Sequence, residues 1–155
     1  MTIGYDVMHA KSHGLCISNL EKVATYTRQF EGLRLKPYTC PSGKLTIGYG
    51  HNLEDNGITR QMAEDMLYLD LEVANMECYA AIPCYAKLND ARKFVLLDMC
   101  FNMGIKKLLT FKKMLAALDK RDFPEAKKQL LDSKYARQVG NRAQVLARIL
   151  ETGEW

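Results

Sequence analysis

Apolar residues recur at steps of three and four over most of the chain, which is the period of an amphipathic helix. Capping residues, glycines and prolines mark where these stretches begin and end. The pattern predicts helices over residues 18–30, about 59–81, from 89 or 90 to about 104, from 110 onward, 124–131 and 141–152.

The longest of these helices carries a regular apolar stripe. Its members follow one another at steps of four, three, four, three and four: Met62, Met66, Leu69, Val73, Met76 and Ala80. A helix of about 20 residues is roughly 30 Å long, which is enough to join two lobes. Methionine at this spacing is typical of a packed core, so we predict that the stripe is buried.

Residues 33–49 break the helical period and predict a small β-sheet. Apolar and basic residues alternate over residues 33–37, and a Pro-Ser-Gly turn follows at 41–43. Residues 45–49 are β-branched and aromatic, which favours a second strand opposite the first. Residues 52–57 are interpreted as a polar loop.

Together these elements predict an α+β fold that is mostly helical. We expect a small lobe with the sheet at about residues 18–60, a linking helix at about 59–81 and a helical lobe at about 82–155. Residues 1–17 show no clear period and are treated as an N-terminal extension of uncertain order. A chain of 155 residues can bury a sizeable core.

The sequence predicts neither a membrane span nor an export signal. It has no run of 18 apolar residues, and polar residues interrupt the apolar ones within residues 1–17. We therefore expect synthesis in a cytoplasm, so that any target outside the cell has to be reached by another route.

The net charge of +4 is unevenly distributed. Residues 1–104 hold 10 basic and 12 acidic residues, whereas residues 105–155 hold 12 basic and 6 acidic ones. The basic part is compatible with nucleic acid, an anionic membrane or an anionic cell wall as partner, and equally with a solvated helical surface.

The cysteines and histidines do not predict a disulfide framework or a metal site. The five cysteines are odd in number and irregularly spaced: Cys16, Cys40, Cys78, Cys84 and Cys100. His9 and His13 are four residues apart, but no cysteine pair lies near them, so a zinc site is not favoured. We expect most of the thiols to be reduced, with Cys78 and Cys100 buried.

Glu31 conflicts with ordinary helix preferences. Gly32 is placed to end the first helix, so Glu31 lies in the last turn, where the helix macrodipole disfavours a negative charge. A protonated carboxyl avoids this conflict, and a general acid has to carry its proton. Glycosidic cleavage needs such an acid and a second group that activates or replaces water. Glu31 fits the first role, and Cys40 and Thr46 are candidates for the second.

Residues 31–51 contain the sequence Glu-Gly-Leu-Arg-Leu-Lys-Pro-Tyr and, further on, Thr-Ile-Gly-Tyr-Gly-His. This block resembles the phage-type lysozymes, the muramidase endolysins of glycoside hydrolase family 24. The motif of that family is Glu, eight residues, Asp or Cys, five residues and Thr, and Glu31, Cys40 and Thr46 meet it without a gap.

The resemblance covers about residues 15–155 and includes Phe-Asn-Met-Gly at 101–104 and Gly-Asn-Arg-Ala at 140–143. It implies two lobes joined by a long helix, with a glycan bound between them, and no metal or organic cofactor. It also implies site residues: Glu31 as general acid, Cys40 and Thr46 on the water side, and Tyr38, His51, Asn102 and Arg142 as supporting or substrate-binding residues.

Several of these supporting residues also have a purely structural interpretation. His51 is interpreted as a hydrogen-bonding partner rather than as a catalyst. Tyr38 fits packing of the sheet as well as it fits contact with a glycan, and Asn102 fits a role at the end of its helix. Arg142 lies at a helix start, where the dipole disfavours a cation, and this favours a functional partner.

Cys40 departs from the Asp that many relatives carry at this position. An ordinary thiol has a pKa of about 8.5 and is mostly protonated at neutral pH. Cys40 therefore needs a lowered pKa, for which Lys44 and His51 are candidate causes, or it acts as a weak base or nucleophile. A passive turn cysteine is the alternative, and whether the reaction would retain or invert the anomeric configuration stays open.

The resemblance implies a monomeric N-acetylmuramidase that cleaves the β-1,4 bond between N-acetylmuramic acid and N-acetylglucosamine in peptidoglycan glycan strands. The implied setting is phage-driven lysis, in which a separate membrane pore releases the enzyme. The basic C-terminal third would favour electrostatic contact with an anionic wall or membrane, and no nucleic-acid partner is expected.

Three other functions compete with this prediction. A lytic transglycosylase uses one acid and no water, and the candidate water-side residues argue against it. A catalytically inactive wall-binding homologue would keep the fold without turnover. A nucleic-acid binder would use the Lys-rich helices, and its affinity would depend strongly on salt.

Overall fold

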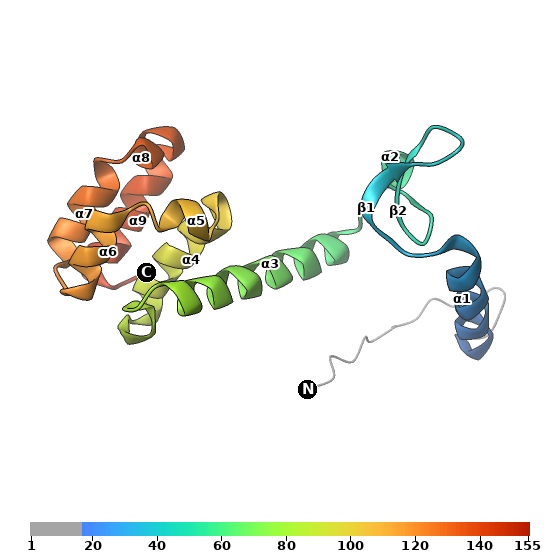
Figure 1. Cartoon of the computed structure of the whole chain (residues 1–155), viewed down its shortest axis with the longest axis horizontal. Coiled ribbons are helices and arrows are strands. Elements are labelled where there is room, and N and C mark those ends of the chain that lie inside the picture. The colour runs from blue at the N-terminus through green and yellow to red at the C-terminus, as the bar shows by residue number, and fades with distance from the viewer. Residues whose placement is uncertain (1–16) are drawn as a thin grey trace. The chain divides into compact units, whose positions relative to one another are not determined.

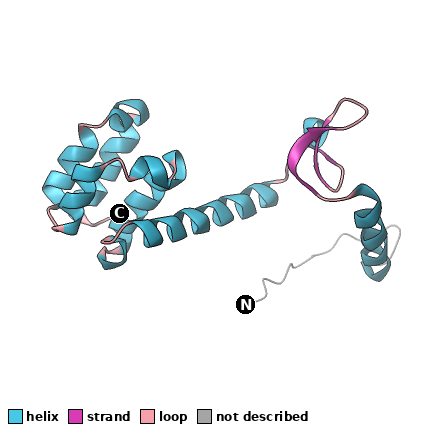
Figure 2. Cartoon of the chain, in the orientation of Figure 1, coloured by secondary structure: helices cyan, strands magenta, loops and turns pink. Residues whose placement is uncertain are grey.

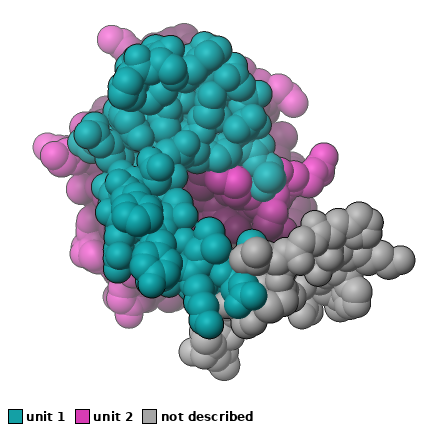
Figure 3. All heavy atoms as spheres, turned by 90° about the vertical axis from the view of Figure 1, so that its right-hand side faces the viewer, with its two compact units in different colours: residues 1–59 teal, residues 60–155 magenta. Residues whose placement is uncertain are grey.

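The computed structural model describes residues 17–155, which fall into two compact units (Figure 3). Unit 1 is residues 1–59 and unit 2 is residues 60–155. All strands of the described residues lie in unit 1, whereas unit 2 consists of helices and the loops between them (Figure 2). This agrees with the predicted α+β class with a helical majority.

The described part of unit 1 begins with helix α1, Ile17–Glu31 (Figure 1). The helix starts one residue before the predicted range and ends where it was expected. Gly32 has a φ of +68°, a left-handed conformation that glycine adopts without strain, and its N–H donates to the Arg28 carbonyl oxygen at 3.2 Å. Glu31 is therefore the last residue of the helix.

An antiparallel sheet of three strands follows, in the order β1-β2-β3. The strands are β1, Arg34–Thr39, β2, Leu45–Gly48, and β3, His51–Asn52. The central strand places Thr46 opposite Tyr38 on one side and opposite Asn52 on the other. The first two strands were predicted, but the third is too short to give a period in the sequence.

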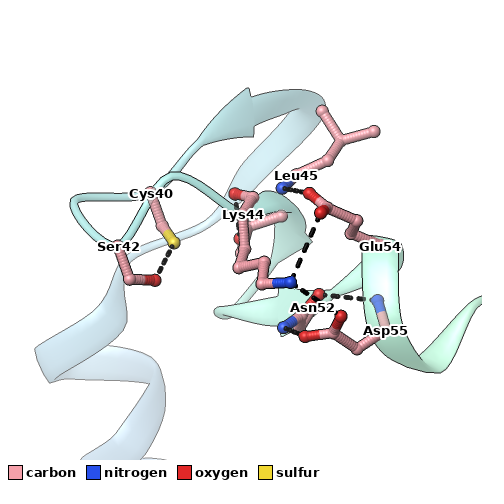
Figure 4. A network of polar contacts seen from close by, with 8 residues as sticks. Cys40, Ser42, Lys44, Leu45, Asn52, Glu54 and Asp55 are labelled. Atoms are coloured by element: carbon pink, nitrogen blue, oxygen red, sulfur yellow. Dashed lines mark hydrogen bonds and ion pairs between the residues drawn. The ribbon is translucent and has the colours of Figure 1, made fainter.

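The predicted polar loop at residues 52–57 is wrong, because this stretch forms part of β3 and the one-turn helix α2, Leu53–Asn56. The Asn52 side chain caps the helix by accepting from the Asp55 N–H at 3.0 Å. Glu54 then reaches back to the sheet and accepts from the Leu45 N–H at 3.1 Å (Figure 4). Side-chain contacts across the turn thus order residues that look like a loop in the sequence.

Unit 2 opens with the long helix α3 (Figure 1). The elements of this unit are α3, Arg60–Ala81, the 3-10 turn η1, Tyr85–Lys87, α4, Asp90–Met103, α5, Ile105–Leu108, α6, Lys112–Asp119, α7, Phe123–Leu131, α8, Lys134–Val139, and α9, Asn141–Thr152. The short elements η1, α5 and α8 were not predicted.

Side-chain caps explain several helix starts in unit 2. Asn89 accepts from the Arg92 N–H and begins α4, as predicted, and Ser133 accepts from the Ala136 N–H and begins α8. The predicted start at Thr110 is wrong. Its hydroxyl donates to the Lys107 carbonyl oxygen at 2.7 Å, which closes the preceding helix.

We predicted that the methionine stripe of α3 is buried, but it is not buried in the core of unit 2. Met66, Leu69 and Met76 are more than half exposed, and the side chains of α3 that enter the core of unit 2 are Ala74 and Cys78. The stripe has the period of a buried face, but the helices of unit 2 pack against a different face of α3.

The core of unit 2 is centred on α4. Val95, Leu96 and Met99 are fully buried there, whereas Phe101 is 43% exposed. Cys100 is buried as predicted. The end of α9 is tied to α4 because Arg92 donates to the carbonyl oxygens of Leu150, at 2.9 Å, and Glu151, at 2.8 Å.

Candidate functional site

The Glu31 side chain folds back over the turn between β2 and β3. A Cβ atom placed on Gly50 would lie 3.2 Å from Glu31 Oε2, so this carboxylate oxygen occupies the space beside the glycine. Gly50 also has a φ of +83°, which a residue with a Cβ adopts only with strain. Glycine at this position therefore leaves room for the Glu31 carboxylate. We did not predict this role of Gly50 from the sequence.

Cys40 lies at the turn between β1 and β2, where its Sγ is 2.9 Å from the Ser42 hydroxyl oxygen (Figure 4). The turn is closed by hydrogen bonds from the Cys40 N–H to the Lys44 carbonyl oxygen and from the Gly43 N–H to the Cys40 carbonyl oxygen. Hydrogen bonding from the Ser42 hydroxyl, then from Thr46, lowers the pKa of Cys40 to about 7, and the Lys44 backbone adds to this. A large fraction of the thiol is therefore ionised at neutral pH.

Thr46 is buried, with 3% of its surface exposed, in the central strand. Its hydroxyl lies 3.0 Å from the Lys44 carbonyl oxygen and donates to it. A hydroxyl has one proton, so Thr46 cannot donate to this carbonyl and to the Cys40 thiolate at the same time. The Ser42 hydroxyl is thus the steadier donor to the thiolate, and Thr46 is the second.

The two side chains that we expected to act on Cys40, those of Lys44 and His51, are engaged elsewhere. Lys44 Nζ pairs with Asp55 at 2.9 Å and with Glu54 at 3.3 Å (Figure 4). His51 Nε2 lies 2.7 Å from the Gly57 carbonyl oxygen, which can only accept, so this nitrogen carries a hydrogen. The predicted cause of the lowered pKa is therefore corrected: it comes from hydroxyl donors rather than from the Lys44 ammonium or the His51 ring.

Tyr38 is half-buried at the end of β1, and the Arg34 guanidinium lies 4.4 Å from its ring centroid. The ring thus has a packing partner within the sheet. Two parts of the predicted site are thus formed within unit 1. Cys40 and Thr46 lie together at one end of the β1–β2 pair, and Glu31 lies beside the β2–β3 turn.

Two of the predicted site residues lie in unit 2. Asn102 is exposed near the end of α4, and Arg142 is the second residue of α9. Arg142 forms a two-point ion pair with Asp98 of α4, with Nε donating to Oδ2 at 3.0 Å and Nη2 donating to Oδ1 at 2.5 Å. Asp98 was not singled out in the sequence, because its partner lies 44 residues away along the chain.

A groove with a volume of about 610 Å³ runs between α6, α7 and α8. Phe111, Met114 and Tyr135 provide its apolar lining, and four lysines surround it: Lys107, Lys112, Lys113 and Lys134. Asp132 is the acidic residue among the groove residues. The positive charge of this region could be read from the amino-acid sequence, but the concentration of four lysines around one cavity could not.

Tyr135 is 95% buried at this groove, and its hydroxyl has no hydrogen-bonding partner within the described residues. Burial raises the pKa of Tyr135, and the negative charge of Asp98 raises it further, while Arg142 lowers it. The hydroxyl is therefore neutral at physiological pH, and its ring packs edge-on against Phe111 with centroids 6.3 Å apart.

Within residues 17–155, no set of three or more His, Cys, Asp or Glu side chains is arranged to hold a metal ion. His9 and His13 lie outside the described residues. None of the helices in the same range combines the length and the apolar character that crossing a membrane requires.

The sequence profile of the phage lysozyme family matches residues 28–149. A protein named probable T4-type lysozyme 1, from Dictyostelium discoideum, is 27% identical and aligns with 88% of this chain and 96% of its own length. An endolysin of Acyrthosiphon pisum secondary endosymbiont phage 1 is 30% identical over 79% of this chain and 84% of its own. The pre-baseplate central spike protein Gp5 of Enterobacteria phage T4 is 27% identical over 84% of this chain, but only 28% of its own length aligns.

The geometry at Cys40 predicts which group sets its ionisation. Alkylation of Cys40 by iodoacetamide, followed by peptide mass spectrometry across a pH series, is expected to report a pKa of about 7. Ser42→Ala removes the first donor and is expected to raise this pKa toward the ordinary value of about 8.5. Lys44→Met is the matched control, and it leaves the pKa near that of the wild type. A shift as large in Lys44→Met as in Ser42→Ala would restore the electrostatic explanation.

Proposed function

Because the chain belongs to the phage lysozyme family, we propose that it is an N-acetylmuramidase acting on the β-1,4 bond between N-acetylmuramic acid and N-acetylglucosamine. Family membership supports the coarser part of this statement, a lysozyme-type glycosidase that hydrolyses peptidoglycan. The bond, the catalytic residues and the biological setting are the finer parts of the proposal.

Glu31 is proposed as the general acid. It gives its proton to the glycosidic oxygen as the bond from this oxygen to the anomeric carbon breaks. The position of its carboxylate against Gly50, in the same compact unit as Cys40 and Thr46, is the observation that carries this assignment. The approach places the carboxylate beside the β2–β3 turn, at a position where a residue with a Cβ would meet it.

Cys40 is proposed as the group on the water side. With a pKa of about 7, a substantial part of the thiol is thiolate at neutral pH. The thiolate can take a proton from water while the water oxygen bonds to the anomeric carbon. Alternatively, its sulfur bonds to that carbon as the glycosidic bond breaks, and water, deprotonated by the Glu31 carboxylate, then displaces the sulfur as thiolate. The first route inverts and the second retains the configuration, so the anomer of the product distinguishes them.

The remaining predicted residues have supporting roles in this proposal. Thr46 is proposed to accept from the water or the sugar beside Cys40, while its one hydroxyl proton goes either to the Lys44 carbonyl oxygen or to the thiolate. His51 fixes the segment after β3 through Gly57 and thereby supports the turn that carries Gly50. Tyr38, Asn102 and Arg142 are proposed as contacts to the substrate.

The lysine-lined groove of unit 2 is proposed as the region that contacts the anionic wall. Four cations around a cavity with one acidic residue concentrate positive potential there. The biological setting that we propose is phage-driven lysis, with synthesis in the host cytoplasm and release through a separate pore. A monomer is sufficient for every contact described.

Clearing of purified peptidoglycan tests the catalytic assignment. Glu31→Gln keeps the size of the side chain and removes its proton, and we expect its clearing rate to fall by at least about 100-fold. Glu64→Gln, at an exposed position on α3, is the matched control and clears at the wild-type rate. Full activity of Glu31→Gln would exclude Glu31 as the acid.

Cys40→Ser tests the contribution of the thiol in the same assay, because it leaves the neighbouring residues unchanged. A serine hydroxyl is not ionised at neutral pH, so we expect clearing to slow by about 10-fold or more. Unchanged clearing would mean that the thiol is not required and that Thr46 with a water molecule is sufficient for the reaction. Products with 1,6-anhydro ends instead of reducing ends would identify a transglycosylase, and wall binding without clearing would identify an inactive homologue.

The groove predicts salt-dependent binding to the wall. We expect the double variant Lys112→Ala/Lys113→Ala, in the Glu31→Gln background, to sediment less with peptidoglycan and to show a shallower dependence of binding on salt concentration. Lys22→Ala/Lys36→Ala changes the net charge equally at exposed positions of unit 1 and serves as control. Equal effects of the two double variants on wall binding would mean that binding depends on the net charge of the protein rather than on the groove.

A further inference from the structure

Asp98 of α4 and Arg142 of α9 form an ion pair that is held by two hydrogen bonds. Among the described residues, it is the one such ion pair between these two helices. The Asp98 side chain is 16% exposed, whereas the Arg142 side chain is 43% exposed. The acid is thus the buried member of the pair and the cation reaches the surface. A two-point contact fixes the plane of a guanidinium as well as its position.

Arg142 needs such a partner because of where it lies. It is the second residue of α9, and Gly140, which precedes the helix, has no side chain to cap it. The positive end of the helix macrodipole repels a cation there and favours an anion. Pairing with the Asp98 carboxylate offsets this repulsion of the guanidinium.

The ion pair is not the only contact that docks the two helices. Arg92 of α4 binds the carbonyl oxygens at the other end of α9, and its guanidinium also stacks 3.5 Å from the Phe123 ring centroid. Leu146 and Leu150 of α9 are buried in the same core as α4. Docking of α9 on α4 therefore does not rest on the ion pair alone, which leaves room for a second role of Arg142.

Within unit 2, one edge of the guanidinium is left for a ligand. Nε and Nη2 of Arg142 are directed at Asp98, while Nη1 has no acceptor within residues 60–155. An arginine clamped on one edge and free on the other presents fixed donors to an anionic group, because the clamp removes rotamers that binding would otherwise have to fix.

We propose that Asp98 is a positioning residue, which holds Arg142 so that its free edge binds an anionic group of the substrate. This inference rests on the proposed function, because it takes the glycan strand with its carboxylate substituents as the ligand. Asp98 itself does not touch the substrate. It acts through the direction that it imposes on the Arg142 guanidinium.

Steady-state kinetics on soluble, uncross-linked glycan fragments tests the proposal. Asp98→Asn keeps the shape of the side chain and removes its charge, so we expect KM to rise by about 10-fold with kcat within about twofold. Arg142→Met is expected to raise KM at least as much. Because Asp98 acts through Arg142, the double variant is expected to match Arg142→Met, and Asp98→Glu is expected to recover part of the affinity.

Arg92→Met is the matched structural control. It breaks the other polar link between α4 and α9 and is expected to lower the melting temperature while leaving KM unchanged. Unchanged KM in Asp98→Asn, or effects of Asp98→Asn and Arg142→Met that simply add, would overturn the positioning role. Failure of the proposed function itself is recognised separately, since the wild type would then release no product from the fragments.

Discussion

The close approach of the Glu31 carboxylate to Gly50 is the constraint on which the proposed site depends. A helix that ends in an acid leaves that side chain free to turn in several directions. Here the chain reverses after Gly32, runs through the sheet and returns at a turn that has no Cβ where the carboxylate lies. A methyl group at Gly50 would meet the carboxylate in this position, and the strands between these points place Cys40 and Thr46 in the same unit.

The second half of the site is governed by neutral hydroxyl groups rather than by charges. Lys44 is neutralised by two acids of α2, so it stabilises the fold of the sheet instead of the thiolate. Ser42, two residues from Cys40, supplies the main donor within the turn itself. Cys40 is thus ionisable near neutral pH through neutral donors rather than through the Lys44 ammonium.

Elements with strong local signals could be predicted from the sequence, and those that depend on distant contacts could not. Asn89 and Gly104 mark the ends of α4, and the spacing of Glu31, Cys40 and Thr46 indicates the family, because each of these signals lies within a short stretch. The helices α2 and α8 are too short to show a period. The Asp98–Arg142 pair and the lysine-lined groove join residues far apart in the sequence, and the α3 stripe shows that helical period alone does not identify the face that packs.

Comparison of Gly50→Ala with Gly48→Ala in the peptidoglycan-clearing assay tests the central claim most directly. Both glycines have positive φ, of +83° and +67°, so either alanine introduces backbone strain, but only the methyl group at position 50 would meet the Glu31 carboxylate. The account predicts that Gly50→Ala clears at least about 10-fold more slowly than Gly48→Ala at matched folded fraction. Equal clearing by the two variants would contradict it.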